Sequence, residues 1–170
     1  MNTGQSLLTI LAMVLLSVLI LRVNNTFLTT GSVLIDSKFV ITATSLATTQ
    51  LQEVSSLAFD NYTDTNPTTD LNDLTPPASL GAESGETNDH LYNDIDDYNG
   101  WHKDVPIVME SGKPAENFRV SCSVVYVSTA NPDVTSNVAT WNKKITVTVS
   151  NPFMPDTVKV STIYSYWVFR

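Results

Sequence analysis

The chain has 170 residues, of which 42% are hydrophobic and 15% charged, and its formal net charge is −8 at pH 7. This length suits about one domain. The nine Lys and Arg residues are scattered, whereas nucleic-acid binding needs clustered cations to neutralise phosphates, so that class is excluded. One cysteine, Cys122, excludes an internal disulfide and cysteine-based metal sites, and we expect it to be a buried small hydrophobe.

The chain opens with its most apolar run. Residues 7–21 are apolar except for Thr9 and Ser17, and the first charged side chain is Arg22. A run that is apolar on every side predicts a helix for lipid or for a protein interior, and residues 7–23 are just long enough to cross a bilayer. The side chains expected on this membrane or filament-core surface are Leu7, Leu8, Ile10, Leu11, Val14, Leu15, Leu16, Val18, Leu19, Ile20 and Leu21.

The apolar pattern then becomes one-sided. Apolar residues recur every three or four positions over residues 33–59, which is typical of a helix with one buried face. We expect one long helix over residues 5–59, with its apolar half at 5–23. The stretch Asn24–Ser32 predicts local bending or unwinding, because its side chains compete for backbone hydrogen bonds. The face expected to pack on the rest of the fold consists of Ile35, Phe39, Ala43, Leu46, Val54 and Leu57.

The middle region, residues 60–101, is acidic and irregular. Residues 61–100 carry nine acidic side chains and no Lys or Arg, and three prolines and three glycines rule out long regular elements. We expect an irregular connection of this length either to lie over the surface of the fold or to contain a functional site. Carboxylates suit calcium, although the EF-hand spacing is absent, and solvated surface charge is the alternative. The candidate calcium ligands are Asp89, Asp94, Asp96 and Asp97.

The last region, residues 102–170, predicts strands. The segments FRVSCSVVYV, KKITVTVS and VKVSTIYSYWVF alternate apolar and polar positions and are rich in β-branched and aromatic residues. VPIVME offers a fourth strand. We therefore expect an α+β fold in which the long N-terminal helix packs on a C-terminal antiparallel β-sheet of three to four strands. The regions are then 1–59, 60–101 and 102–170.

Nothing in the sequence favours an enzyme. His90 and His102 lack a nucleophile motif beside them, so we expect surface histidines and no catalytic residues. A secreted enzyme with a removed signal peptide is disfavoured, because no positive n-region precedes the apolar run and no small-residue cleavage site follows it. No cofactor other than calcium is suggested. Asn61 begins a glycan acceptor sequon and is a candidate glycosylation site.

This layout resembles the type IV pilins and the pseudopilins of type II secretion. GQSLLTILAMVLLSVLI looks like their N-terminal signature, and SLATTQLQEVSSLAFD is similar to the end of their long helix. DIDDYNGW followed by FRVSCSVVYV resembles a recurrent loop-and-strand passage of these proteins. The resemblance implies a structural subunit of an extracellular, pilus-like filament, a homopolymer held together by its N-terminal helix. It also implies storage in the cytoplasmic membrane and assembly by inner-membrane pilus or secretion machinery.

Two alternatives stay open beside this filament subunit. The first is a minor pseudopilin of a secretion system, and the second is a monomeric envelope protein held by one helix, with a ligand-binding β domain. Alignment with the family places processing between Gly4 and Gln5, after a leader without Lys or Arg, and we expect the N-terminus to be retained. Thr9 then stands where the family carries a glutamate, so helix packing would have to set the register between subunits.

Overall fold

The computed structural model describes residues 3–109, 113, 115–154 and 156–169, and the chain divides into two compact units, Met1–Phe39 and Val40–Arg170. The helices are α1 (Thr3–Val54) and α2 (Asn61–Thr65), and the strands are β1 (His102–Ile107), β2 (Glu116–Tyr126), β3 (Asn142–Ser150) and β4 (Val158–Ser165). Four short 3-10 helices are η1 (Leu71–Asp73), η2 (Pro77–Ser79), η3 (Asp96–Tyr98) and η4 (Tyr166–Phe169).

The first unit is a stretch of α1 alone. The unwinding predicted as one possibility at Asn24–Ser32 is wrong, because α1 is helical throughout this stretch. The hydroxyl groups do not draw the backbone out of the helix. Instead the Thr26 hydroxyl donates to the Arg22 carbonyl at 2.9 Å, and the Thr30 hydroxyl donates to the Thr26 carbonyl at 2.8 Å. Bonds of this kind satisfy the side chain and leave the helical hydrogen bonds in place.

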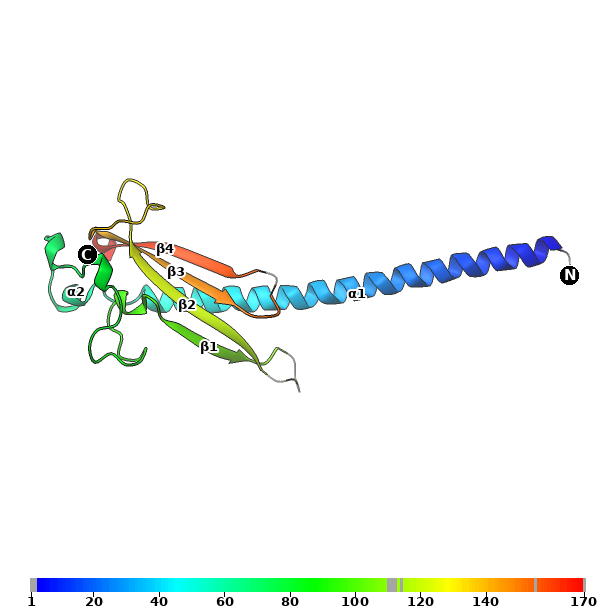
Figure 1. Cartoon of the computed structure of the whole chain (residues 1–170), viewed down its shortest axis with the longest axis horizontal. Coiled ribbons are helices and arrows are strands. Elements are labelled where there is room, and N and C mark those ends of the chain that lie inside the picture. The colour runs from blue at the N-terminus through cyan, green and yellow to red at the C-terminus, as the bar shows by residue number, and fades with distance from the viewer. Residues whose placement is uncertain (1–2, 110–112, 114, 155, 170) are drawn as a thin grey trace. The chain divides into compact units, whose positions relative to one another are not determined.

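The second unit contains the sheet, which has four antiparallel strands in the order β1-β2-β3-β4 (Figure 1). The register places Cys122 of β2 opposite Val147 of β3, and Val147 opposite Val160 of β4. The predicted fourth strand exists as β1, although it begins three residues before VPIVME. Pro106 is tolerated because β1 lies at the edge of the sheet. The predicted last strand is too long, because η4 follows directly after Ser165.

The sheet buries one face, and the C-terminal part of α1 packs on it, as the α+β prediction required (Figure 1). The alternation predicted for β2 and β3 is confirmed. Their buried apolar residues are Phe118, Val120, Cys122, Val124, Tyr126, Ile145, Val147 and Val149. Ala43, Ala47 and Val54 of α1 are fully buried, so small side chains let the helix backbone approach its neighbours closely.

The helix face was predicted with two errors. Ile35 is 56% exposed, and the side chains from Ser32 to Lys38 are all exposed, so burial on α1 begins at Phe39. The periodicity of a sequence shows which face of a helix is apolar, but it does not show how much of that face is covered by the rest of the fold. Leu57 lies beyond the helix, which ends at Val54 and not at residue 59. Leu46 is half-buried, and the fully buried Ala47 was not predicted.

The helix ends early because the chain after it is used for another backbone pairing. The N–H of Leu57 donates to the Val54 carbonyl at 3.2 Å, which tightens the last turn. Ala58 then forms a parallel bridge with Asp94, in which the Ala58 N–H donates to the Asn93 carbonyl and the Ile95 N–H donates to the Ala58 carbonyl. This bridge fixes the segment around Asp94 beside the end of α1.

Candidate assembly helix and buried carboxylate cluster

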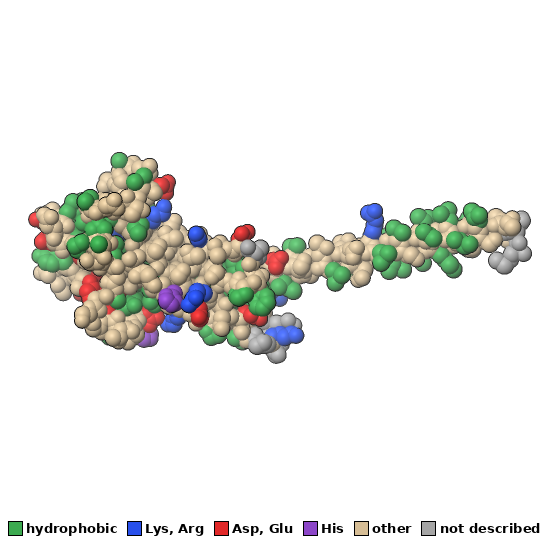
Figure 2. All heavy atoms as spheres, viewed as in Figure 1, with side chains coloured by type: hydrophobic (Ala, Val, Ile, Leu, Met, Phe, Trp, Pro, Cys, Tyr) green, Lys and Arg blue, Asp and Glu red, His purple; other side chains and the backbone are tan. Residues whose placement is uncertain are grey.

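The predicted apolar surface of α1 is exposed along its whole length. Its eleven side chains range from 47% exposed at Val18 to 72% at Leu7 (Figure 2). The most apolar 18-residue window of α1 has a mean hydropathy of 2.5 and is 0% buried, so by length and composition this helix can cross a membrane. Gly4 and Gln5, the candidate processing positions, lie in the exposed first turns of α1.

The exposed apolar surface continues beyond the part that a bilayer would need. No side chain from Thr3 to Lys38 is buried, and this length of helix spans about 54 Å at about 1.5 Å per residue. A bilayer has a hydrocarbon core of only about 30 Å. Between residue 23 and Lys38, the exposed large apolar residues are Phe27, Leu28, Val33, Leu34 and Ile35. Lipid around residues 7–23 would leave these side chains uncovered.

A buried lysine lies at the centre of the second unit. The Lys143 side chain is 0% exposed, and its Nζ donates to the Phe59 carbonyl at 2.7 Å, to Asp60 at 3.0 Å and to Asp96 at 2.6 Å. The Nζ atom also lies 4.3 Å from the centre of the Phe59 ring and 4.8 Å from that of Tyr126. Lys143 therefore joins β3 to the end of the helix region and to the 3-10 helix η3.

Asp60 is the better-satisfied partner of this lysine. Its carboxylate accepts hydrogen bonds from the Thr75 N–H at 2.9 Å and from the Tyr126 hydroxyl at 3.3 Å, besides the one from Lys143. The Asp60 side chain also caps α2 by accepting from the Tyr62 N–H. The buried ion pair is thus embedded in a hydrogen-bonded network, as buried charges require.

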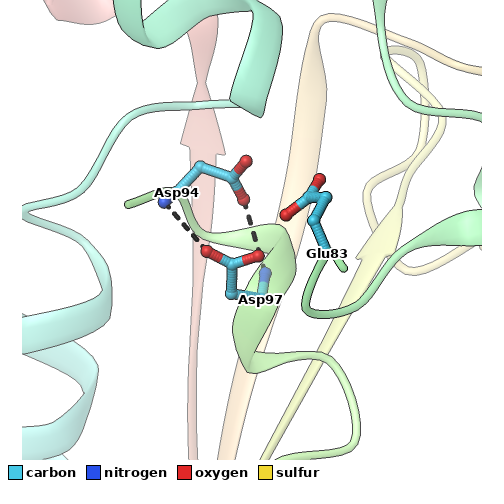
Figure 3. Close-up of side chains that lie close together, drawn as sticks. All are labelled: Glu83, Asp94 and Asp97. Atoms are coloured by element: carbon cyan, nitrogen blue, oxygen red, sulfur yellow. Dashed lines mark hydrogen bonds between the residues drawn. The ribbon is translucent and has the colours of Figure 1, made fainter. Parts of the chain in front are cut away.

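A second group of acidic side chains, here called the carboxylate cluster, consists of Glu83, Asp94 and Asp97. One carboxylate oxygen from each lies within 4.8 Å of the others, and Figure 3 shows the three groups turned toward one another. Asp94 Oδ1 accepts from the Asp96 N–H at 2.6 Å, and Asp97 Oδ2 accepts from the Asn93 N–H at 3.0 Å. These bonds to the backbone fix both aspartates and leave Asp94 Oδ2 and Asp97 Oδ1 without a hydrogen-bond partner among the described residues.

The local backbone also positions Glu83. Its loop begins after Gly81, which has a φ of 142° and so adopts a conformation that favours glycine. Asn99 ties this loop to the sheet, because its Nδ2 donates to the Leu80 carbonyl at 3.1 Å and its Oδ1 accepts from the Val124 N–H at 3.1 Å. The Glu83 N–H donates to the Glu86 carboxylate at 3.0 Å, which closes the loop.

The electrostatics of the cluster are unfavourable for three negative charges. Burial, together with the negative charge of Asp97, raises the pKa of Asp94 to about 7. Burial likewise raises the pKa of Glu83 to about 8, with contributions from its acidic neighbours Asp97 and Glu86. Burial also raises the pKa of Asp97. The cluster therefore binds either protons or a cation more readily than isolated carboxylates would.

The structure brings together only half of the predicted calcium ligands. Asp94 and Asp97 meet in the cluster, but Asp96 is held by Lys143, and Asp89 pairs with Lys103 at 2.8 Å. Sequence reasoning missed Glu83, which lies eleven positions before Asp94 and belongs to no spacing motif. It also missed Lys143, for which a signal existed. Lys143 has the same strand parity as Ile145 and Val147, and that parity predicts a buried side chain.

The other predicted sites lie at the surface. His90 and His102 are both exposed, and no nucleophile is paired with either in the hydrogen bonds of the described residues. Asn61 is exposed at the first position of α2, where a glycan would meet solvent. Comparisons of the chain with protein-family models, with curated proteins and with solved structures gave no match.

Proposed function

We propose that the chain is a structural subunit of an extracellular filament, assembled through residues 3–38 of α1 packing against the same helix in other copies. The single observation that carries this proposal is the length of the uncovered apolar surface. Burying a Leu, Ile or Val side chain contributes about 1.5–3 kcal/mol. The exposed apolar side chains at 7–23 and 27–35 thus provide a large driving force for leaving water.

Copies of the same helix would cover this surface over its full length, whereas a bilayer would cover only part of it. Storage in a membrane before assembly is compatible with this proposal, because lipid and a helical core are both apolar. A repeated contact that does not close on itself produces a helical polymer, in agreement with the pilin-like layout of the sequence. Inner-membrane machinery would then move the subunit from lipid to filament.

The hydroxyl groups within α1 do not oppose such a core. The Thr29 hydroxyl donates to the Asn25 carbonyl at 2.9 Å, and the Ser17 hydroxyl donates to the Met13 carbonyl at 2.8 Å. A hydroxyl that is already hydrogen-bonded costs less to bury than a free one. The first ionised side chain after Arg22 is Asp36, so the helix offers a long segment that contains a single charge.

Substitution at Leu15 tests the assembly. We expect Leu15→Asp to abolish filaments seen by electron microscopy of sheared cell-surface material, because it places a carboxylate inside the apolar core. Leu15→Met is the matched control and should assemble normally, since it keeps an apolar side chain of similar volume. Both variants should show the same near-UV circular dichroism in detergent, because Leu15 is exposed in the single chain.

Two results would contradict the proposal. The first is normal filaments from Leu15→Asp, which would show that this surface is not the core. The second is recovery of the wild-type chain from membranes only as monomers, with no filaments under any expression condition. That second outcome would favour the envelope protein held by one helix, because the same α1 segment satisfies the length and composition of a membrane span.

A further inference from the structure

We propose that the chain binds a calcium ion between Glu83, Asp94 and Asp97, and that this ion fastens the loop after Gly81 to η3. The proposal is independent of filament assembly, because all three residues lie within the second unit. It rests on two separate observations. The first is the convergence of three carboxylates, and the second is that each of these side chains has a buried oxygen without a hydrogen-bond partner among the described residues.

The unpartnered oxygens point to a ligand. Asp94 is 0% exposed and Asp97 is 2% exposed, yet Asp94 Oδ2 and Asp97 Oδ1 have no hydrogen-bond partner among the described residues. Glu83 Oε2 is likewise buried and has no hydrogen-bond partner among the described residues. A buried polar atom without a partner is costly, and most such atoms in folded proteins are satisfied. Three such atoms on side chains that converge indicate that a cation completes the site.

The charged side chains around the cluster do not supply a positive partner for it. Among the described residues, the buried charged side chains are the aspartates Asp60, Asp94, Asp96 and Asp97 and a single cation, Lys143. The Lys143 ammonium is taken up by Asp60 and Asp96, and its hydrogen bonds do not reach the cluster. Among the described residues, no cationic side chain therefore forms a hydrogen bond with the cluster.

The chemistry of the donors selects calcium. All three ligands are carboxylate oxygens, which suit hard cations rather than zinc or copper. Oxygens bound to one calcium ion at about 2.4 Å lie at most about 4.8 Å apart, and the three ligand oxygens lie within 4.8 Å of one another. Magnesium demands a tighter, regular octahedron at about 2.1 Å, which three side chains from an irregular loop are poorly placed to provide.

The site also has a route to solvent, which a metal site needs. A surface pocket of about 310 Å³ opens beside the cluster, and its lining includes Asp97, Tyr92 and Trp101. Glu83 itself is only half-buried. Water entering from this side can supply the remaining ligands, since calcium takes about six to eight oxygens.

The test compares the melting temperature of the full chain in detergent with calcium and with chelator. For wild type we expect calcium at about 100 times its dissociation constant to raise the melting temperature by about 5–10 °C. Glu83→Gln should lose this increment and weaken calcium binding, measured by calorimetry, at least tenfold. Because it removes one of three repelling charges, it should melt in chelator at the wild-type temperature or above.

Asp89→Asn is the matched control. It removes a carboxylate from the same acidic region, but Asp89 is paired with Lys103 outside the cluster, so calcium affinity should stay within twofold of wild type. An equal melting temperature of wild type in calcium and chelator would overturn the proposal. So would a wild-type response in Glu83→Gln, a lost response in Asp89→Asn, or an equal response to magnesium at the same concentration.

Discussion

At the scale of single residues, Lys143 has the most demanding environment in the chain. It is fully buried, and it forms hydrogen bonds with two aspartates and one backbone carbonyl. A buried ion pair contributes little net stability compared with an apolar replacement of the whole group. Removal of one partner alone is strongly destabilising, because it leaves the other charges buried and unpaired. A substitution of Lys143 should therefore lower the free energy of unfolding mainly because it leaves Asp60 and Asp96 buried without a counter-charge.

We predict that Lys143→Met destabilises the fold by about 3–5 kcal/mol, because Asp60 and Asp96 lose the cation that pairs with both of them. Lys144→Met is the matched control. The neighbouring Lys144 pairs with Asp133, whose side chain is 86% exposed, so its loss should cost less than about 1 kcal/mol. Denaturant unfolding of the full chain in detergent measures both values. Equal effects of the two substitutions would contradict the role assigned to Lys143.

Much of this environment could not be predicted from the sequence. Strand alternation indicates that Lys143 faces inward, but it does not say which acids meet it, because Asp60 and Asp96 lie 83 and 47 positions away. The same holds for the carboxylate cluster. The acidic composition of residues 61–100 predicted a cation site in this region, whereas the choice of Glu83 over Asp89 and Asp96 depends on how the irregular loop folds back.

At the scale of elements, prediction succeeded where a pattern repeats many times. The alternation in β2 and β3 and the long apolar run of α1 each involve many positions, so their type was predicted correctly. The ends of elements depend on a few hydrogen bonds to distant segments, such as the bridge between Ala58 and Asp94, and they were predicted less well. Within Asn24–Ser32 the Thr26 and Thr30 hydroxyls bond to carbonyls of the helix itself, a choice of partner that composition alone does not reveal.

The packing of α1 on the sheet gives a prediction at this scale. Ala47 is fully buried, so Ala47→Leu should destabilise the fold by about 1–3 kcal/mol through overpacking. Thr48→Leu introduces the same side chain at the next position of the helix, which is exposed, and should change stability by less than about 0.5 kcal/mol. Thermal unfolding in detergent compares the two. A tolerated Ala47→Leu would show that the helix does not approach its neighbours closely.

At the scale of the whole molecule, each of the two units contains groups that lack the partners they need. The first unit exposes apolar side chains that need other apolar surfaces, and the second unit buries carboxylates that need a cation or protons. Under the two proposals made above, each need is met by something outside the single chain, namely further copies in one case and calcium in the other. The stability of the isolated chain should therefore depend strongly on its surroundings, and pH is the most direct probe of the second need.

We predict that in chelator the melting temperature falls as pH rises from about 5 to about 8. The folded-state pKa is raised from 3.8 to about 7 at Asp94 and from 4.5 to about 8 at Glu83. In this window the folded chain holds protons that the unfolded chain has released, so raising the pH favours unfolding. The charged and titratable groups that surround them are Asp97, Glu86, Asp60, Asp96 and Lys143.

Calcium should remove most of this pH dependence, because it neutralises the same carboxylates without needing protons. The difference in melting temperature between calcium and chelator should accordingly be larger at pH 8 than at pH 5. Glu83→Gln should flatten the slope in chelator, whereas Asp89→Asn should keep it, since Asp89 is stabilised as a carboxylate by Lys103. A melting temperature in chelator that is constant or rises over this range would mean that ionising the cluster does not destabilise the folded chain. Calcium would then have no charge repulsion in the cluster to neutralise.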